Sequence, residues 1–159
     1  MTDYVVEAKP TIIEQSRNTI FKIAGIGFLA GLLTYALAWL MQHYILKDLI
    51  CNGDANCSDG VMFSGNIASI VISIFAVLLL VKVGSYRPLL IVIAAVVSLW
   101  GLSTWLQPLS DVESAIWYAI AFALTYVTFA WIARIRNVPV MVIATVVVVL
   151  LLRIISIYA

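Results

Sequence analysis

The stretch VMFSGNIASIVISIFAVLLLV, residues 61–81, contains no charged side chain. At 1.5 Å per residue a helix of this length reaches about 30 Å, which is the thickness of the hydrocarbon core of a bilayer. In lipid the backbone N–H and C=O groups must pair within the segment, so a helix is expected rather than an open strand. The stretch therefore predicts a membrane-spanning helix, which we extend to residues 61–83.

The rest of the chain is built in the same way. Of its 159 residues, 64% are hydrophobic and 11% are charged, whereas soluble domains carry about 25% charged residues. Ser110-x-x-Glu113 is typical of a capping box, and Pro88 and Pro139 suit the first turn of a helix. We predict an all-α, polytopic integral membrane protein, a five-transmembrane-helix bundle over residues 19–159, with helices at about 19–46, 61–83, 88–106, 112–133 and 138–157.

Residues 1–18 precede the first apolar segment and are too short to fold alone. They contain Pro10 and a second capping-box pattern, Thr11-x-x-Glu14. We expect a cytoplasmic segment that forms an interfacial helix on the membrane surface. A cleavable signal peptide is not expected, because this region is charged and lacks a short apolar core.

The distribution of charge predicts the orientation. Seven of the nine basic residues fall on one side of the five predicted spans: Lys9, Arg17, Lys22, Lys82, Arg87, Arg134 and Arg136. The other side holds Lys47 and Arg153, with five acids: Asp48, Asp54, Asp59, Asp111 and Glu113. Cytoplasmic loops are enriched in Lys and Arg, so we predict a multi-pass protein of the plasma or inner membrane with a cytoplasmic N-terminus and an extracytoplasmic C-terminus.

The most polar loop is CNGDANCSDG, residues 51–60, which holds both cysteines. A calcium loop would need a glycine and a glutamate where this sequence has Cys57 and Phe63. A redox site usually has a C-x-x-C spacing or a basic neighbour, and here the neighbours are acids. We favour a structural disulfide between Cys51 and Cys57, because the predicted compartment is oxidising.

Arg153 lies deep in the last apolar segment. Charged residues within a span are functional candidates, so one interpretation is an anion-binding or gating residue that faces a polar cavity. The other is a side chain that extends to the outer surface, paired with Asp111 or Glu113.

Other polar residues offer weaker indications of a site. Asn66, Ser69 and Ser73 in the second segment could line a polar path or bond across helices. His43 is the only histidine and suits a position at the membrane interface. No acid occurs between Gly60 and Ser110 or after Glu113, which argues against a proton antiporter.

Small residues recur at four-residue spacing on two predicted helices, which allows close helix packing in lipid. These positions are Gly27, Gly31, Ala115, Ala119 and Ala123. The packing partner is either another helix of the same bundle, a second copy of the chain or a different membrane subunit.

The sequence contains no catalytic constellation, no cofactor motif, no metal-ligand cluster and no basic run that would indicate nucleic-acid binding. An enzyme is therefore not expected, and the lipid bilayer is the expected partner. We favour a structural or accessory subunit of a membrane complex. The alternative is a small oligomeric transporter or channel for a small or lipid-linked substrate.

Overall fold

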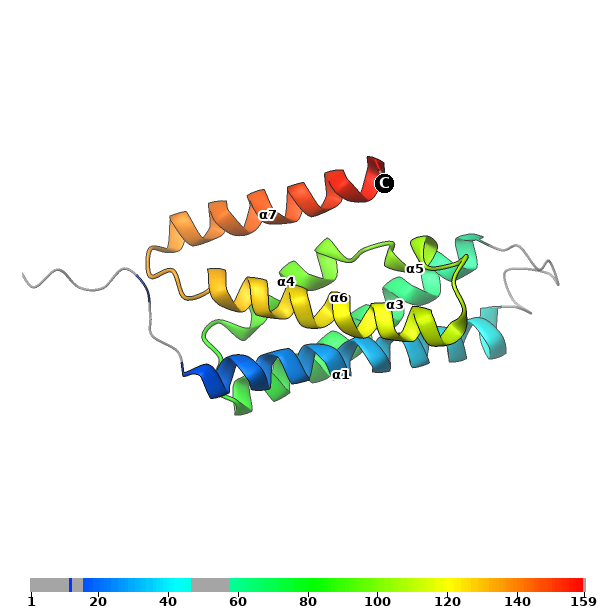
Figure 1. Cartoon of the computed structure of the whole chain (residues 1–159), viewed down its shortest axis with the longest axis horizontal. Coiled ribbons are helices and arrows are strands. Elements are labelled where there is room, and N and C mark those ends of the chain that lie inside the picture. The colour runs from blue at the N-terminus through cyan, green and yellow to red at the C-terminus, as the bar shows by residue number, and fades with distance from the viewer. Residues whose placement is uncertain (1–11, 13–15, 47–57, 159) are drawn as a thin grey trace, which may run out of the picture.

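The structure, a computed structural model, describes Ile12, residues 16–46 and residues 58–158 of the chain, and in these parts it is all-α apart from one isolated β-bridge between Ile12 and Ile135 (Figure 1). Its helices are α1 (Arg17–Met41), a π-helical turn η1 (Gln42–Leu46), α3 (Ser58–Lys82), α4 (Pro88–Ser98), α5 (Leu102–Trp105), α6 (Asp111–Ile132) and α7 (Val138–Tyr158). The all-α prediction is confirmed.

Three helices are long and apolar enough to cross a membrane: Arg17–Ile45, Gly60–Lys82 and Asp111–Ile132. Large hydrophobic side chains also cover the outside of the bundle; Phe21 is 76% exposed and Leu124 is 63% exposed. Water would not tolerate so continuous an apolar surface, whereas lipid chains do. The chain is therefore a membrane protein in contact with a bilayer.

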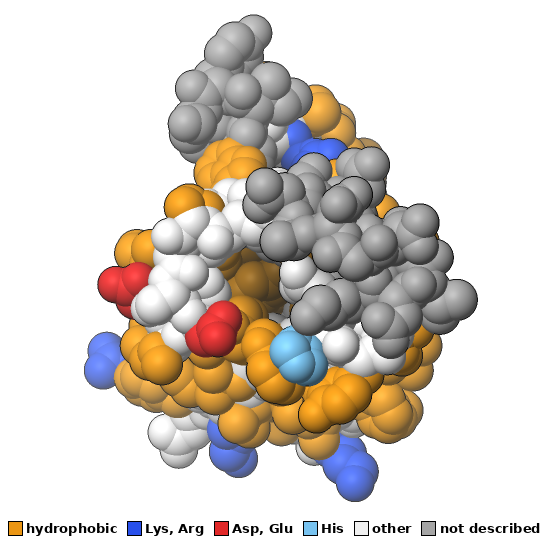
Figure 2. Space-filling model, turned by 90° about the vertical axis from the view of Figure 1, so that its right-hand side faces the viewer, with side chains coloured by type: hydrophobic (Ala, Val, Ile, Leu, Met, Phe, Trp, Pro, Cys, Tyr) orange, Lys and Arg blue, Asp and Glu red, His pale blue; other side chains and the backbone are white. Residues whose placement is uncertain are grey.

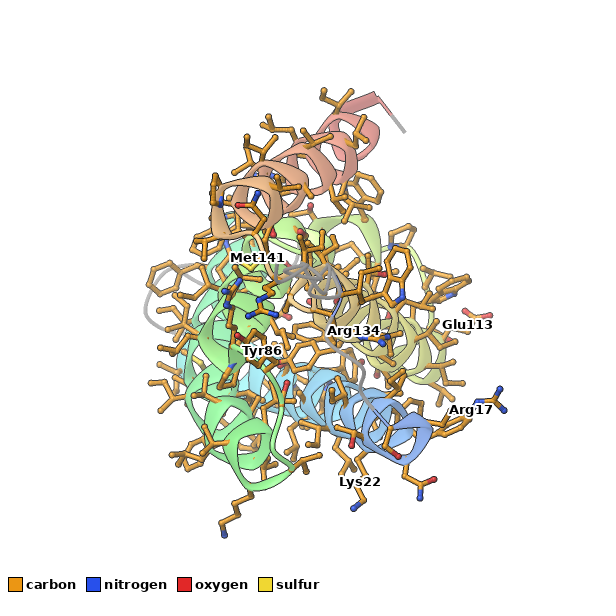
Figure 3. The ribbon with its side chains drawn as sticks, turned by 90° about the vertical axis from the view of Figure 1, so that its left-hand side faces the viewer. Arg17, Lys22, Tyr86, Glu113, Arg134 and Met141 are labelled. Atoms are coloured by element: carbon orange, nitrogen blue, oxygen red, sulfur yellow. The ribbon has the colours of Figure 1, made fainter. Side chains whose placement is uncertain are left out.

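Successive segments run in alternating directions between the same two ends of the molecule (Figure 1). One end, which we call the basic end, carries the basic residues Arg17, Lys22, Lys82, Arg87, Arg134 and Arg136. Figure 3 views this end, and Arg17 and Lys22 point away from the bundle. The opposite end, the acidic end, carries Asp111 and Glu113 at the start of α6.

Helix α6 lies at the centre of the packing, against α1 on one side and α4 on the other. Phe122, Tyr126 and Phe129 of α6 are fully buried. The contact with α1 is very close, because a Cβ atom on Gly31 would lie 2.7 Å from the Ala119 Cα atom, and one on Gly27 would lie 2.9 Å from the Ala123 Cα atom. A side chain at either glycine would force the two helices apart.

The third apolar segment differs from expectation. The predicted helix over 88–106 is interrupted after Ser98, and Gly101 adopts a left-handed φ of 88° before α5 begins. Only glycine adopts this conformation without strain. Two further features favour the break: the Ser98 hydroxyl donates to the Ala94 carbonyl oxygen at 2.7 Å, and side chains of other helices bind the freed peptide groups.

Helix α7 packs against α4 and α6 along a single face, on which Met141 and Thr145 are buried. Its other faces are exposed, and in Figure 1 it lies at the edge of the bundle. At the basic end the Arg87 guanidinium donates to the Met141 sulfur and to the Ile135 carbonyl oxygen. The turn before α4 is thereby tied to the turn before α7.

Two of the sequence predictions fall outside the described residues. These are the Cys51–Cys57 disulfide and the interfacial helix in the N-terminal segment, of which the structure describes only Ile12 and residues 16–18. The capping box at the start of α6 is confirmed: the Glu113 amide donates to the Ser110 hydroxyl, and the Ser110 amide donates to the Glu113 carboxylate at 3.1 Å.

Candidate functional site

A cavity of about 690 Å³ opens at the acidic end. Figure 2 shows a hollow with hydrophobic side chains in its depth, and one acidic side chain and the histidine lie near its edge. The cavity is lined by α1, η1, α3, α5, α6 and the turn between α5 and α6, through Tyr35, Ala38, Trp39, Gln42, Val61, Ser64, Ser103, Thr104, Leu106, Gln107, Pro108, Leu109, Asp111, Ser114 and Tyr118. Its volume lies within the range of about 300–1,000 Å³ that is usual for ligand pockets.

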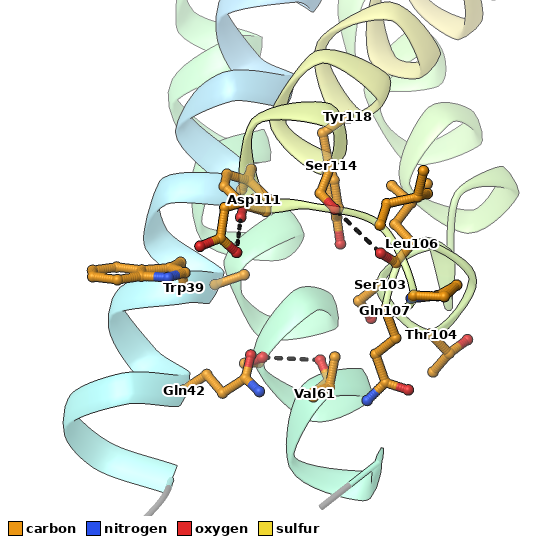
Figure 4. A pocket seen from close by; sticks show the side chains of 15 residues that line it. Trp39, Gln42, Val61, Ser103, Thr104, Leu106, Gln107, Asp111, Ser114 and Tyr118 are labelled. Atoms are coloured by element: carbon orange, nitrogen blue, oxygen red, sulfur yellow. Dashed lines mark hydrogen bonds between the residues drawn. The ribbon is translucent and has the colours of Figure 1, made fainter. Parts of the chain in front are cut away.

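The wall formed by α1 and α6 is held by two tyrosines and a carboxylate. The Tyr35 hydroxyl donates to Asp111 Oδ1 at 3.0 Å (Figure 4). The Tyr35 and Tyr118 rings lie with their centroids 5.7 Å apart. Asp111 is thus held in the wall of the cavity by a hydrogen bond from a phenolic hydroxyl group.

The opposite wall is α5, which the break at Gly101 turns toward the cavity. Ser103 projects from it and is 9% exposed, and its hydroxyl has no hydrogen-bond partner among the described residues. The Tyr118 hydroxyl is the polar neighbour of Ser103, since both flank Gly65. The Ser103 oxygen is itself buried, so it does not open onto the cavity space.

Two glutamines stand at the mouth. Gln42, from η1, and Gln107, from the turn after α5, both line the cavity (Figure 4). Each amide offers both hydrogen-bond donors and an acceptor. The turn that carries Gln107 is closed by the Ser114 hydroxyl, which donates to the Leu106 carbonyl oxygen at 3.2 Å.

Arg153 and Asn66, both singled out in the sequence, bind the two sides of one peptide group. Arg153 Nη1 donates to the Trp100 carbonyl oxygen at 2.6 Å, and the Gly101 amide donates to Asn66 Oδ1 at 3.2 Å. The Trp100–Gly101 peptide lies at the helix break, where its groups lack helical partners. Side chains of α3 and α7 therefore stabilise the break that places α5 in the cavity wall.

Arg153 thus contacts a backbone carbonyl oxygen and not the carboxylates of Asp111 or Glu113, which bind Tyr35 and Ser110. Neither Arg153 nor Asn66 lines the cavity. Whether either residue has a role beyond this contact stays a prediction.

The remaining predicted residues lie elsewhere. Ser69 and Ser73 donate to carbonyl oxygens of their own helix, those of Gly65 at 2.8 Å and Ile70 at 2.6 Å. His43 stacks on Trp39 with ring centroids 5.1 Å apart, next to the cavity. Of the predicted packing residues, Gly27, Gly31, Ala119 and Ala123 lie at the α1–α6 contact, and Ala115 lies one turn before Ala119 on α6.

The sequence analysis did not identify the residues of the cavity wall as a site. The available signal was the run from Gly101 to Asp111, in which polar residues and a glycine interrupt an apolar segment. The cavity itself needs Tyr35 and Gln42, which lie far away in the sequence.

The lining does not resemble a catalytic or metal centre. Among the described residues that line it, Asp111 is the only carboxylate, and no three described His, Cys, Asp or Glu side chains lie close enough to share a metal ion. The arrangement is suited to binding through hydrogen bonds. The chain matches no known family model, no curated protein sequence and no solved structure.

Proposed function

We propose that this chain is a small transporter that crosses the membrane five times and binds a small polar substrate in the acidic-end cavity. The observation that carries this proposal is the cavity itself, a hydrogen-bonding space of about 690 Å³ inside an otherwise apolar bundle. Polar groups within a membrane domain are costly, and in membrane proteins they usually mark a binding site or a pathway.

The broken third segment supports this function. Non-helical backbone at membrane depth is tolerated where it is buried in protein or lines a cavity, and many transporters bind substrate at such interrupted helices. Here the left-handed Gly101 and the short α5 bring Ser103 and Thr104 to the cavity. A continuous helix over 88–106 would not make this turn.

Five crossings are supported by direction and length. Helix α7 has 21 residues, which corresponds to about 31 Å, and the pair α4–α5 runs between the same two ends as the longer helices (Figure 1). The basic end would face the cytoplasm of a plasma or inner membrane, according to the usual excess of Lys and Arg on that side. The cavity would then open to the outside.

The proposal is tested by filling the cavity. Ala38 lines it and is 7% exposed, so Ala38→Phe places a ring inside, whereas Ala36→Phe adds the same ring on an exposed position of the same helix. Native mass spectrometry of the full chain, extracted in nanodiscs, should show a bound small molecule in the wild type and in Ala36→Phe, and none in Ala38→Phe. A ligand-free wild type, or a ligand retained by Ala38→Phe, would contradict the function.

A second candidate is the accessory subunit. It is favoured by α7, which contacts the rest of the bundle along one face and leaves residues such as Ile143, 63% exposed, on the others. Co-purification from native membranes distinguishes the two candidates, because an accessory subunit should retain a heteromeric partner in fixed stoichiometry.

A further inference from the structure

We propose that the acidic-end cavity binds an organic cation, such as a trimethylammonium group. This inference rests on the proposed ligand-binding function and adds the chemical class of the ligand. It is drawn from a group of aromatic rings and a carboxylate that adjoin in the lining.

Three aromatic side chains stand among the described residues of the lining. Tyr35 and Trp39 come from α1, where a spacing of four residues places them on one face of the helix. The Tyr118 ring of α6 lies against Tyr35, with ring centroids 5.7 Å apart and ring planes tilted by 54°. The three rings therefore give the cavity an aromatic wall that α1 and α6 share.

Asp111 joins this wall. Its Oδ1 atom accepts the hydrogen bond from the Tyr35 hydroxyl at 3.0 Å, so the carboxylate adjoins the edge of the Tyr35 ring. A ligand that contacts the carboxylate from the cavity thus also lies next to the aromatic wall. The N-terminus of α6 contributes only about half a positive unit charge, so it does not cancel the charge of Asp111.

This combination favours a cation with an apolar surface. The electron-rich face of an aromatic ring attracts a cation within about 6 Å of its centroid, and aromatic rings bind quaternary ammonium groups in other proteins. Asp111 is exposed and contributes a modest attraction, because solvent screens it. The rings add to this attraction and also pack against the methyl groups of the ligand. A hard metal ion would gain less, because it requires a set of oxygen ligands.

The neutral carbon isostere of choline tests whether charge is recognised. Choline and 3,3-dimethylbutan-1-ol have nearly the same shape, but only choline carries a positive charge. Dissociation constants for the two compounds are measured by saturation-transfer NMR on the full chain in dodecyl maltoside micelles, which contain no ammonium group. We expect choline to bind about tenfold or more tightly than its isostere, because two exposed rings and one carboxylate each add a few-fold.

Two matched pairs of variants locate the bound cation. Trp39→Leu and Asp111→Asn should each lower the ratio of the two affinities by about two- to fivefold, because each removes one attraction for the charge. Trp117→Leu and Glu113→Gln make the same chemical changes at exposed positions of α6 that do not line the cavity, and they should leave the ratio unchanged. A purely structural role would weaken the binding of both compounds alike and would not move the ratio.

The same ammonium chemistry could come from a free compound or from a phosphatidylcholine headgroup. In a second arm the micelles contain phosphatidylcholine or phosphatidylglycerol, and the retained lipid is measured by native mass spectrometry. Retention of phosphatidylcholine in preference to phosphatidylglycerol, reduced by Trp39→Leu and not by Trp117→Leu, assigns the cation to a lipid headgroup. Choline binding in the first arm without such retention assigns it to a free compound.

Three results would overturn the inference. Equal affinities for choline and its neutral isostere would show that charge is not recognised. An equal fall of the ratio in all four variants would place the bound cation outside the cavity. Absence of choline binding, together with no preference for phosphatidylcholine, would refute the ligand class. In each case the Ala38→Phe experiment decides the proposed function separately.

Discussion

Replacement of Arg153 by leucine tests whether this residue holds α7 against the break in the third segment. In the structure Arg153 Nη1 donates to the Trp100 carbonyl oxygen at 2.6 Å, and no backbone amide of the described chain donates to that oxygen. Arg153→Leu removes the donor and leaves the carbonyl group unpaired. Helix α7 should then dock less firmly against α4.

The magnitude follows from two ranges. Hydrogen bonds that involve a charged group contribute about 1.5–3 kcal/mol, whereas hydrogen bonds between membrane helices contribute about 0.6 kcal/mol on average and up to about 1.7 kcal/mol. The ranges meet near 1.5 kcal/mol, which corresponds to about a tenfold shift toward undocked α7. The free-energy cost of placing the Arg153 guanidinium group in the bilayer is nearly the same whether α7 is docked or undocked, because α7 remains in the bilayer in both states. This cost therefore adds little to the shift.

Hydrogen–deuterium exchange of the full chain in nanodiscs measures this shift. Amides of residues 101–105 should exchange up to about tenfold faster in Arg153→Leu, because tertiary contacts protect this short helix. Arg136→Leu is the matched control, since it makes the same chemical change at an exposed position of the basic end.

A double variant with Asn66→Leu adds a further test. Asn66 and Arg153 bind the same Trp100–Gly101 peptide, so their effects should couple by at least about 0.5 kcal/mol. If Arg153→Leu exchanges like Arg136→Leu and the double variant is additive, the reasoning about the peptide is refuted.

Three further predictions follow, two from contacts in the structure and one from the sequence. Gly31→Ala should lower the free energy of unfolding by about 1–3 kcal/mol in denaturant titration, because its Cβ atom would lie 2.4 Å from the Tyr118 carbonyl oxygen. Gly25→Ala is the control and should raise it by about 0.5–1 kcal/mol, because nothing lies within 4 Å of its Cβ position. Equal effects of the two substitutions would contradict the close contact between α1 and α6. Ser110→Ala removes the cap of α6 and should lower the free energy of unfolding by about 1 kcal/mol; an unchanged value would show that the cap contributes nothing. Cys51 and Cys57 should react with a thiol reagent only after reduction, and free thiols in protein prepared without reductant would exclude the disulfide.

The sequence was sufficient to predict the helices and most of their ends. The long helices could be predicted from apolar runs, because each helix that crosses a bilayer must by itself be long and apolar enough to do so. The start of α6 was predictable because the Ser110-x-x-Glu113 capping box is local. These features depend on neighbours in the chain, and a single sequence contains them.

The break and the cavity could not be predicted in the same way. Gly101 was visible, but its left-handed conformation depends on Asn66 and Arg153, which come from two other helices. The sequence suggested carboxylates as partners for Arg153. In the structure Arg153 binds a backbone carbonyl oxygen, which lacks a helical partner because the helix is broken. Tertiary contacts between distant segments decide such features, and pattern and spacing do not encode them.

Reporter fusions at the two ends of the chain test the five-crossing account most directly. A fluorescent protein that folds only in the cytoplasm and a phosphatase that is active only outside it are each fused ahead of Met1 and after Ala159. Five crossings predict fluorescence from the first position and phosphatase activity from the second. The same reporter active at both positions would contradict an odd number of crossings, and with it the outward-facing cavity.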